Sequence, residues 1–267
     1  MVIRGAAVLL LLSGCAMPPV PAEDRHPTIV SLNPCTDAIL AEVAGPGQVL
    51  AISHYSHDPQ ASSMPQAQAR RFRATGGTVE EVLALRPDVV VAGSFLPPAT
   101  AAALARLGVR VETFDAAASV ADSEAQVRRI AAIAGRPQAG EALVARIEQA
   151  LDDTRAAGSP VPALLWQEGG IVPGPQALVT QLMAHTGLAS HSAARGLGQG
   201  AYLPLEEVLA DPPALILTTG HERLLDHPAL GHLPGARPER IDPSLLYCGG
   251  PTIVRAVARF AELRRSL

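Results

Sequence analysis

The sequence predicts an α/β protein made of two lobes with mainly parallel sheets, joined by a single long α-helix. An internal repeat is the first observation: residues 79–93 read VEEVLALRPDVVVAG, and residues 205–219 read LEEVLADPPALILTT. Each copy predicts a short helix, a proline-marked turn and a strand buried on both faces, as in parallel sheets. The second observation is a helix-forming stretch between the two copies, at residues 138–157, about 30 Å long at 1.5 Å per residue.

Composition limits the class of protein. The chain has 267 residues, 48% of them hydrophobic, and a net charge of −4. This length and apolar content support one large core or two lobes of ordinary size. The negative charge argues against nucleic-acid binding, which requires a basic face.

The N-terminus predicts export. Arg4 precedes a short apolar run, residues 6–12, which is too short to span a bilayer as a helix. The run ends in LSGC, which resembles the lipobox of bacterial lipoproteins with Cys15 as the lipidated thiol. A plain secretory signal with an incidental cysteine is the alternative. We expect a signal peptide over 1–14 and a proline-rich, lipid-anchored tether over 15–27.

The N-terminal lobe is expected over residues 28–136. Apolar β-branched runs predict its strands, and helical periodicity with capping residues predicts its helices. Thr36 or Asp37 is the expected cap of the first helix, and residues 64–75 are expected to be irregular. The expected strands are 28–32, 49–53, 88–92 and 109–114, and the expected helices are 38–43, 78–85, 97–107 and 119–134.

The linking helix is assigned to 137–158. Pro137 suits its first turn, and Gly158 begins the GSP stretch that ends it. Its position between two lobe-sized halves indicates a rigid strut, although an ordinary surface helix of one lobe would give the same pattern. The C-terminal lobe, residues 159–267, repeats the theme, with glycine- and proline-rich loops at 167–175 and 196–202. Its expected strands are 163–166, 215–219 and 239–241, and its main helices are 178–186, the second copy of the repeat and 251–265.

Candidate ligand-binding residues follow from topology. Open α/β sheets bind ligands outside the carboxyl ends of their parallel strands, so loops after the predicted strands are the candidates. We therefore select Asn33, Cys35, His54, Tyr55, Phe95, Gln167, Tyr202, His221 and Tyr247.

Cys35 and Cys248 both fall on predicted cleft loops, one in each lobe. In an oxidising compartment two thiols can pair, but sequence does not show that they meet. A disulfide and two separate free thiols both remain open, and the thiols could also serve together as ligands.

Together, the ordered segments TIVSLNPCTDAILAEVAG, ISHYS, GGTVEEVLALRPDVVVAG, the long helix and LPLEEVLADPPALILTTG resemble a known family. The resemblance, from Thr28 to the end, is to substrate-binding proteins of ABC importers, in the helix-linked class that carries ferric siderophores, haem and cobalamin. It implies a ligand cleft between the lobes, a periplasmic location and delivery of a metal chelate to a permease dimer. It implies no catalysis and no cofactor of the protein itself. The bound ligand would contain cobalt or iron. Nucleic acid is not a partner, and the membrane is reached only through the lipid anchor.

The same resemblance gives Glu80 and Glu206 the role of docking to arginines on the two permease subunits, one per lobe. A carboxylate is also favoured at any helix N-terminus, so simple capping is the alternative. Tyr55 matches a pocket tyrosine of cobalamin binders. Other aromatic residues of that pocket do not carry over, because Ala74 and Gly93 stand near two of their positions.

Two other functions remain open. A zinc- or manganese-binding protein of the same fold could use His54, His57 and Asp58, but the sequence does not define a metal site. An exported hydrolase could assemble a triad from distant residues. The sequence contains no nucleophile elbow, phosphate loop or HExxH motif.

Overall fold

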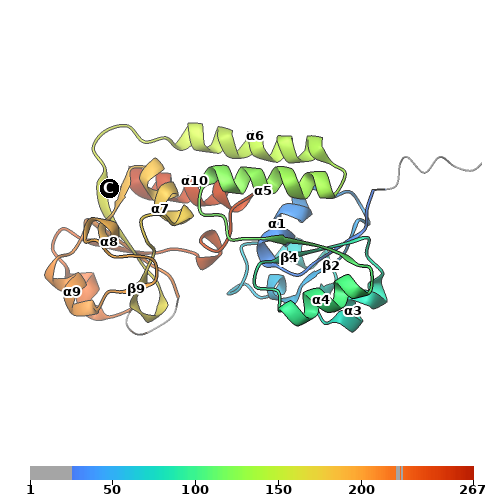
Figure 1. Cartoon of the computed structure of the whole chain (residues 1–267). Coiled ribbons are helices and arrows are strands. Elements are labelled where there is room, and N and C mark those ends of the chain that lie inside the picture. The colour runs from blue at the N-terminus through green and yellow to red at the C-terminus, as the bar shows by residue number, and fades with distance from the viewer. Residues whose placement is uncertain (1–25, 221–222, 224) are drawn as a thin grey trace, which may run out of the picture.

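The computed structural model describes residues 26–220, 223 and 225–267, and it consists of two α/β lobes side by side (Figure 1). The predicted signal peptide, tether and lipidation site Cys15 lie outside the described residues, as does the ligand candidate His221. Among the residues described, no helix has both the length and the hydropathy needed for a membrane span.

The first lobe contains a parallel sheet with strand order β3-β2-β1-β4-β5. Every residue of β4, the strand of the first repeat, is buried, as its β-branched sequence predicts. The strands are β1 (Ile29–Ser31), β2 (Val49–Ser53), β3 (Ala74–Thr75), β4 (Val89–Gly93) and β5 (Arg110–Phe114). The helices are α1 (Pro34–Val43), α2 (Gln66–Ala69), α3 (Val79–Leu85), α4 (Pro98–Arg106) and α5 (Val120–Ile133), with a 3₁₀ turn η2 (His54–His57).

The second lobe has a parallel sheet with strand order β11-β10-β6-β8 and a small antiparallel pair, β7 and β9. Its strands are β6 (Val161–Trp166), β7 (Ile171–Val172), β8 (Leu188–Ser190), β9 (Ala201–Tyr202), β10 (Leu215–Thr218) and β11 (Arg237–Arg240). Its helices are α7 (Leu178–His185), α8 (His191–Ala194), α9 (Leu205–Ala210) and α10 (Thr252–Arg265), with 3₁₀ turns η3 (Glu168–Gly170), η4 (Pro228–His232) and η5 (Pro243–Leu245).

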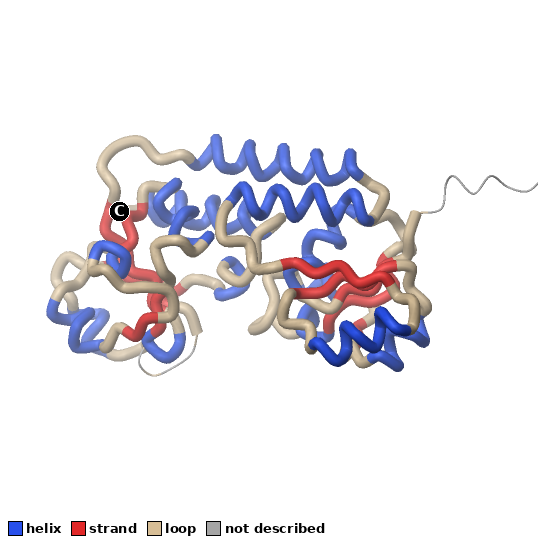
Figure 2. The backbone as a smooth tube through the Cα atoms, in the orientation of Figure 1, coloured by secondary structure: helices blue, strands red, loops and turns tan. Residues whose placement is uncertain are grey.

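Helix α6 (Pro137–Thr154) joins the lobes and runs along one side of both (Figures 1 and 2). It packs against α5 of the first lobe and α10 of the second. One core cluster includes Ile29 from the first lobe, Ile147 from α6 and Phe260 from the second lobe, all fully buried. The predicted fold class is therefore confirmed, but α6 is an integral part of a core that both lobes share.

Several local predictions are wrong. Helix α1 begins at Pro34 and not at residue 38, because the Asn33 side chain, rather than Thr36 or Asp37, caps it. The Asn33 Oδ1 accepts hydrogen bonds from the Cys35 amide at 2.8 Å and the Thr36 amide at 3.3 Å. Residues 64–75 contain α2 and β3, and the loops expected at 167–175 and 196–202 contain β7 and β9. Such short elements carry too few residues to show a hydrophobic period.

Candidate functional site

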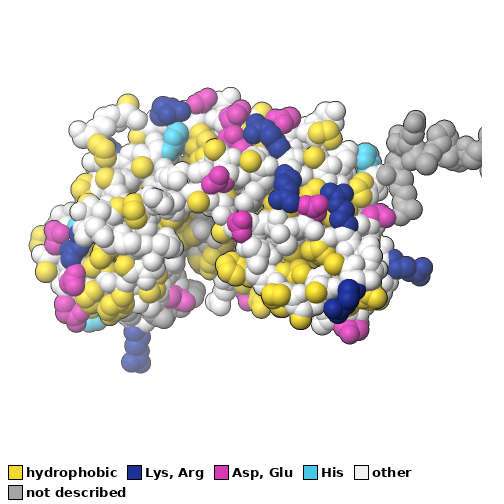
Figure 3. All heavy atoms as spheres, viewed as in Figure 1, with side chains coloured by type: hydrophobic (Ala, Val, Ile, Leu, Met, Phe, Trp, Pro, Cys, Tyr) yellow, Lys and Arg dark blue, Asp and Glu magenta, His cyan; other side chains and the backbone are white. Residues whose placement is uncertain are grey.

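A cleft of about 1130 Å³ lies between the lobes, and its lining comes from both of them. Figure 3 shows the groove between the lobes, on the side opposite α6. Loops after β1 and β4 supply the first wall, and loops after β6 and β10 supply the second. Strands β1 and β4 are neighbours in the first sheet, and β6 and β10 are neighbours in the second. From each pair the chain continues to the next strand of the sheet on opposite sides, from β1 to β2 and β4 to β5, and from β6 to β8 and β10 to β11. Open α/β sheets bind ligands at such a switch in direction.

The structure brings together some of the predicted ligand residues but not all of them. The cleft lining includes Asn33, Cys35, Phe95, Gln167 and Tyr247. By contrast, His54, Tyr55 and Tyr202 lie outside it. The first two belong to η2, which follows β2, one strand away from the β1–β4 pair. The His54 ring lies 4.1 Å from the Tyr55 ring, measured between centroids.

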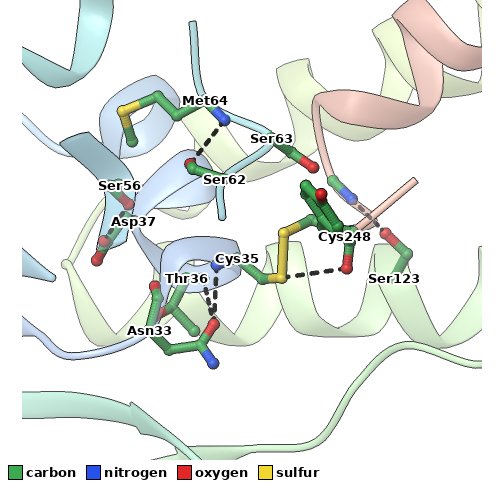
Figure 4. The surroundings of a disulfide bond; sticks show 12 residues. Asn33, Cys35, Thr36, Asp37, Ser56, Ser62, Ser63, Met64, Ser123 and Cys248 are labelled. Carbon is green, nitrogen blue, oxygen red and sulfur yellow. Dashed lines mark hydrogen bonds between the residues drawn. A yellow bond between two sulfur atoms is a disulfide. The ribbon is translucent and has the colours of Figure 1, made fainter. Parts of the chain in front are cut away.

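A disulfide joins Cys35 to Cys248, with 5.2 Å between their Cα atoms (Figure 4). It connects the first turn of α1 in one lobe to the segment before α10 in the other. Next to it, the Gly250 amide donates a buried hydrogen bond of 2.6 Å to the Ser123 Oγ of α5. Of the alternatives left open by sequence, the structure therefore contains the disulfide, and neither cysteine is available as a thiol ligand.

Two exposed aromatic side chains stand in the cleft, one from each lobe. Phe95, after β4, is 91% exposed, and Tyr247, beside the disulfide, is 45% exposed. Single exposed aromatic rings are common on protein surfaces, and Tyr55 and Tyr202 are exposed too, but Phe95 and Tyr247 are the ones that line the cleft. They offer two faces on which a flat, largely apolar ligand could stack.

The rest of the lining contains several amide and carboxylate side chains. It includes Asp115, Glu168 and Gln199, which lie in loops that the sequence predicted to line the cleft. It also includes the amides Gln60, Gln126 and Gln176, which the sequence did not identify because they lie on a helix or in turns without a recognisable motif. Partial burial raises the pKa of the Tyr247 phenol, and the carboxylates Glu168, Asp242 and Asp58 raise it further.

Asp37, in the first turn of α1, is a fully buried carboxyl. Its Oδ2 accepts a hydrogen bond from the Ser53 amide at 3.0 Å. The same oxygen accepts a second one from the Ser56 Oγ at 2.6 Å (Figure 4). These bonds tie η2 to the first turn of α1. Complete burial raises the pKa of Asp37 to about 8, although its hydrogen bonds act in the opposite direction.

The metal-binding alternative depends on the His, Cys, Asp and Glu side chains that the structure describes. Within residues 26–220, 223 and 225–267, no group of three His, Cys, Asp or Glu side chains is arranged to hold a metal ion. His57 and Asp58, proposed from sequence together with His54, thus belong to no such group.

Each copy of the repeat has two adjacent glutamates, and the two differ in their contacts. Glu81 accepts hydrogen bonds from Thr75 and two glycine amides of its own lobe, and Glu207 forms an ion pair with Arg195. Glu80 and Glu206 are exposed, and the side chain of neither forms a hydrogen bond or ion pair with any residue the structure describes. Helices α3 and α9, which carry them, lie on the same side of the molecule, away from α6 (Figure 1).

Comparison with known proteins gives a family match over most of the chain. A family model described as periplasmic binding protein matches residues 29–241. No curated protein sequence matches the chain.

Solved structures share the fold. The periplasmic haem-binding protein RhuT from Roseiflexus sp. RS-1 is 22% identical, with a TM-score of 0.72 over 89% of this chain and 99% of that chain. The haem-binding protein HutB of Vibrio cholerae is 18% identical, with a TM-score of 0.73 over 90% and 99% of the two chains. The vitamin B12-binding protein BtuF of Vibrio cholerae is 19% identical, with a TM-score of 0.68 over 90% and 96%. At these identities the likeness establishes the two-lobed fold alone.

Proposed function

Because the chain belongs to the periplasmic binding protein family, we propose that it is the substrate-binding component of an ABC importer for a macrocyclic metal chelate, a haem or a corrinoid. Proteins of this family are periplasmic binding components of transport and are not enzymes. The protein would need no cofactor of its own, since iron or cobalt would arrive within the ligand.

The observation that carries this proposal is the cleft itself. Its volume of about 1130 Å³ is slightly above the usual range of about 300–1,000 Å³ for small-molecule sites and far exceeds what a bare ion needs. Phe95 and Tyr247 offer aromatic faces from opposite lobes, which suits a flat macrocycle. The haem- and vitamin B12-binding proteins of the same fold support the same class of ligand.

The test is a titration of the purified protein with haem, cyanocobalamin, dicyanocobinamide and several ferric siderophores, followed by absorbance and thermal denaturation. A ligand present at about 100 times its dissociation constant should stabilise the native state by roughly 2.7 kcal/mol. We expect one chelate per chain from the haem or corrinoid group. Binding of none of them, or of a ferric siderophore alone, would contradict the proposal.

Permease docking is the second part of the proposal, with Glu80 and Glu206 as the contacts. Their neighbours Glu81 and Glu207 are already engaged within their own lobes, whereas Glu80 and Glu206 are exposed. The helices that carry them, α3 and α9, lie on the same side of the molecule (Figure 1). Two separated anionic groups, one per lobe, match a permease dimer. Charge complementarity of this kind mainly sets orientation and the rate of encounter.

A Glu80→Ala/Glu206→Ala double variant tests the docking. We expect transport of the chelate to fall at least about tenfold, with ligand affinity unchanged, and with a steeper loss at low salt than at high salt. Glu148→Ala on α6, also exposed, is the matched control. Normal transport by the double variant would assign these glutamates to helix capping alone.

Lipid anchoring through Cys15 is the third part. The LSGC segment and the proline-rich tether support it. Cys15→Ala should move the protein from the membrane fraction to the soluble periplasmic fraction and remove the acyl mass. Unchanged fractionation and mass would favour the plain secretory signal.

A further inference from the structure

The segment 247–250 belongs to the second lobe by sequence, but its contacts attach it to the first lobe. Cys248 is bonded to Cys35 in the first turn of α1. Two residues further on, the Gly250 amide donates a buried hydrogen bond of 2.6 Å to the Ser123 Oγ of α5 (Figure 4). The backbone next to the Tyr247 ring is therefore fixed on the first lobe.

This backbone is also closely packed. A Cβ added to Gly249 would lie 2.9 Å from the Ser123 Cβ, and one added to Gly250 would lie 2.7 Å from the Ile39 Cγ1 of α1. In an interior packed this densely, the segment cannot shift without displacing the two helices it touches. We call this group of residues the cleft junction: Cys35, Ser123, Cys248, Gly249 and Gly250.

Phe95, the aromatic residue from the other wall, is placed from the same part of the first lobe. It follows β4, whose last residue, Gly93, packs against the Asn33 side chain: a Cβ on Gly93 would lie 2.6 Å from the Asn33 Nδ2. Asn33 in turn accepts a 2.8 Å hydrogen bond from the Cys35 amide. A short chain of contacts therefore connects the two aromatic residues through the disulfide.

From this arrangement we infer that the cleft junction, with the Cys35–Cys248 disulfide as its covalent part, positions the Tyr247 ring for ligand binding. The inference rests on the proposed function and gives the disulfide a role in affinity as well as in stability. A ligand that meets a ring already in place does not have to order that segment on binding, so it binds more tightly. With the junction loosened, part of the binding free energy would be lost in ordering the segment.

The first test replaces both cysteines by serine in a Cys15→Ala background, so that no reductant meets the metal of the ligand. The probes are haem, cyanocobalamin and dicyanocobinamide. We expect Cys35→Ser/Cys248→Ser to bind the preferred probe about threefold or more weakly than the disulfide-bonded protein, mainly through faster dissociation. Circular dichroism checks that the variant is folded at the temperature of the titration.

Ser123→Ala is a second, milder variant, which keeps the disulfide. It removes the acceptor of the Gly250 amide and does not line the cleft. It should weaken binding of the same probe about twofold or more. This variant tests the cleft junction even where loss of the disulfide prevents folding.

A cycle of variants identifies Tyr247 as the residue through which the cleft junction acts. In a Tyr247→Ala background, loss of the disulfide should weaken binding by less than about 1.5-fold, because the ring to be positioned is absent. A disulfide that only stabilised the fold would weaken binding by the same factor in both backgrounds.

Val82→Ala/Val208→Ala is the control for stability. These two valines occupy matching positions of the repeat, one in each lobe, and both are fully buried outside the cleft lining. Loss of their buried methyl groups should lower the melting temperature and leave the affinity for the probe unchanged.

The outcomes are distinct. If no probe binds the disulfide-bonded protein, the proposed function fails, and the positioning role fails with it. If a probe binds equally well to the disulfide-bonded protein and the folded serine variant, the proposed function stands and the positioning role is wrong. Unchanged affinity in Ser123→Ala, where the serine variant does not fold, overturns it in the same way. Equal factors in the two backgrounds of the cycle would overturn the assignment to Tyr247.

Discussion

Cys35 and Cys248 are covalently joined between the two walls of the cleft, although 213 residues separate them in the chain. Each belongs to a segment that also lines the cleft. The bond therefore limits how far the two walls can separate where these segments meet.

Loss of this disulfide should destabilise the protein. Closing so long a loop restricts the unfolded chain, and the cost of removing such bonds is typically about 2–5 kcal/mol. In a Cys15→Ala background, we expect urea unfolding to shift to lower denaturant when a reductant is added or when both cysteines are replaced by serine. Thiol titration should find no reactive thiol before reduction. Two reactive thiols in the oxidised protein, or identical unfolding curves with and without reductant, would speak against the bond.

Gly250 should tolerate no side chain. Its φ is +58°, and a Cβ there would lie 2.7 Å from the Ile39 Cγ1. Gly250→Ala should cost about 1–3 kcal/mol through backbone strain and overpacking, and a lowered melting temperature would reveal this. Gly231→Ala is the control, because its Cβ would meet nothing within 4 Å. Equal melting temperatures for the two variants would refute the tight junction between α1 and the segment before α10.

Asp37 should make stability depend on pH. Its pKa is about 8 in the folded protein against 3.8 as its ordinary value, so the native state holds a proton that the unfolded state has released. Stability should fall as pH rises from about 4 to about 8, and the loss should be complete above the folded pKa. Asp37→Asn keeps acceptor capacity without titrating, so its stability should change less over this window. Urea unfolding at about pH 5 and about pH 8.5 measures the difference, and parallel profiles would contradict the raised pKa.

The aromatic residues of the cleft should matter more than those outside it. Phe95→Ala and Tyr247→Ala should each weaken binding of the preferred chelate by about fivefold or more, since a lost stacking face is worth about 1 kcal/mol or more. Tyr55→Ala and Tyr202→Ala remove the same kind of side chain outside the cleft lining and should have little effect. Calorimetric titration of the four variants would distinguish the two pairs, and a larger loss with Tyr55→Ala would move the binding site toward η2.

The strongly periodic or fully apolar elements could be predicted from sequence. Strand β2 has the predicted bounds, and α3 begins at Val79, one residue after the predicted start, because Thr78 caps it. Short edge elements such as β8 could not, because three residues show no period and their place depends on pairing with β6. The start of α1 was missed since Asn33 and Pro34 suit a turn as well as a cap and first helical turn.

Residues of the cleft could be predicted where the order of strands alone determines their position. Loops after β1, β4 and β6 were expected in the cleft, and Asn33, Phe95 and Gln167 lie there. Residues such as Gln126 and Gln176 were not found, because their presence depends on how helices and loops from two lobes meet. Whether Cys35 reaches Cys248 likewise depends on packing between lobes, which spacing in the chain does not encode.

The most direct test is a crystal structure of the protein with the chelate that binds it most tightly. The macrocycle should lie between the carboxyl ends of the two parallel sheets, in contact with Phe95 and Tyr247, at one molecule per chain. A chelate seated on another surface, with the space between the lobes unfilled, would contradict the assignment of that space as the binding site.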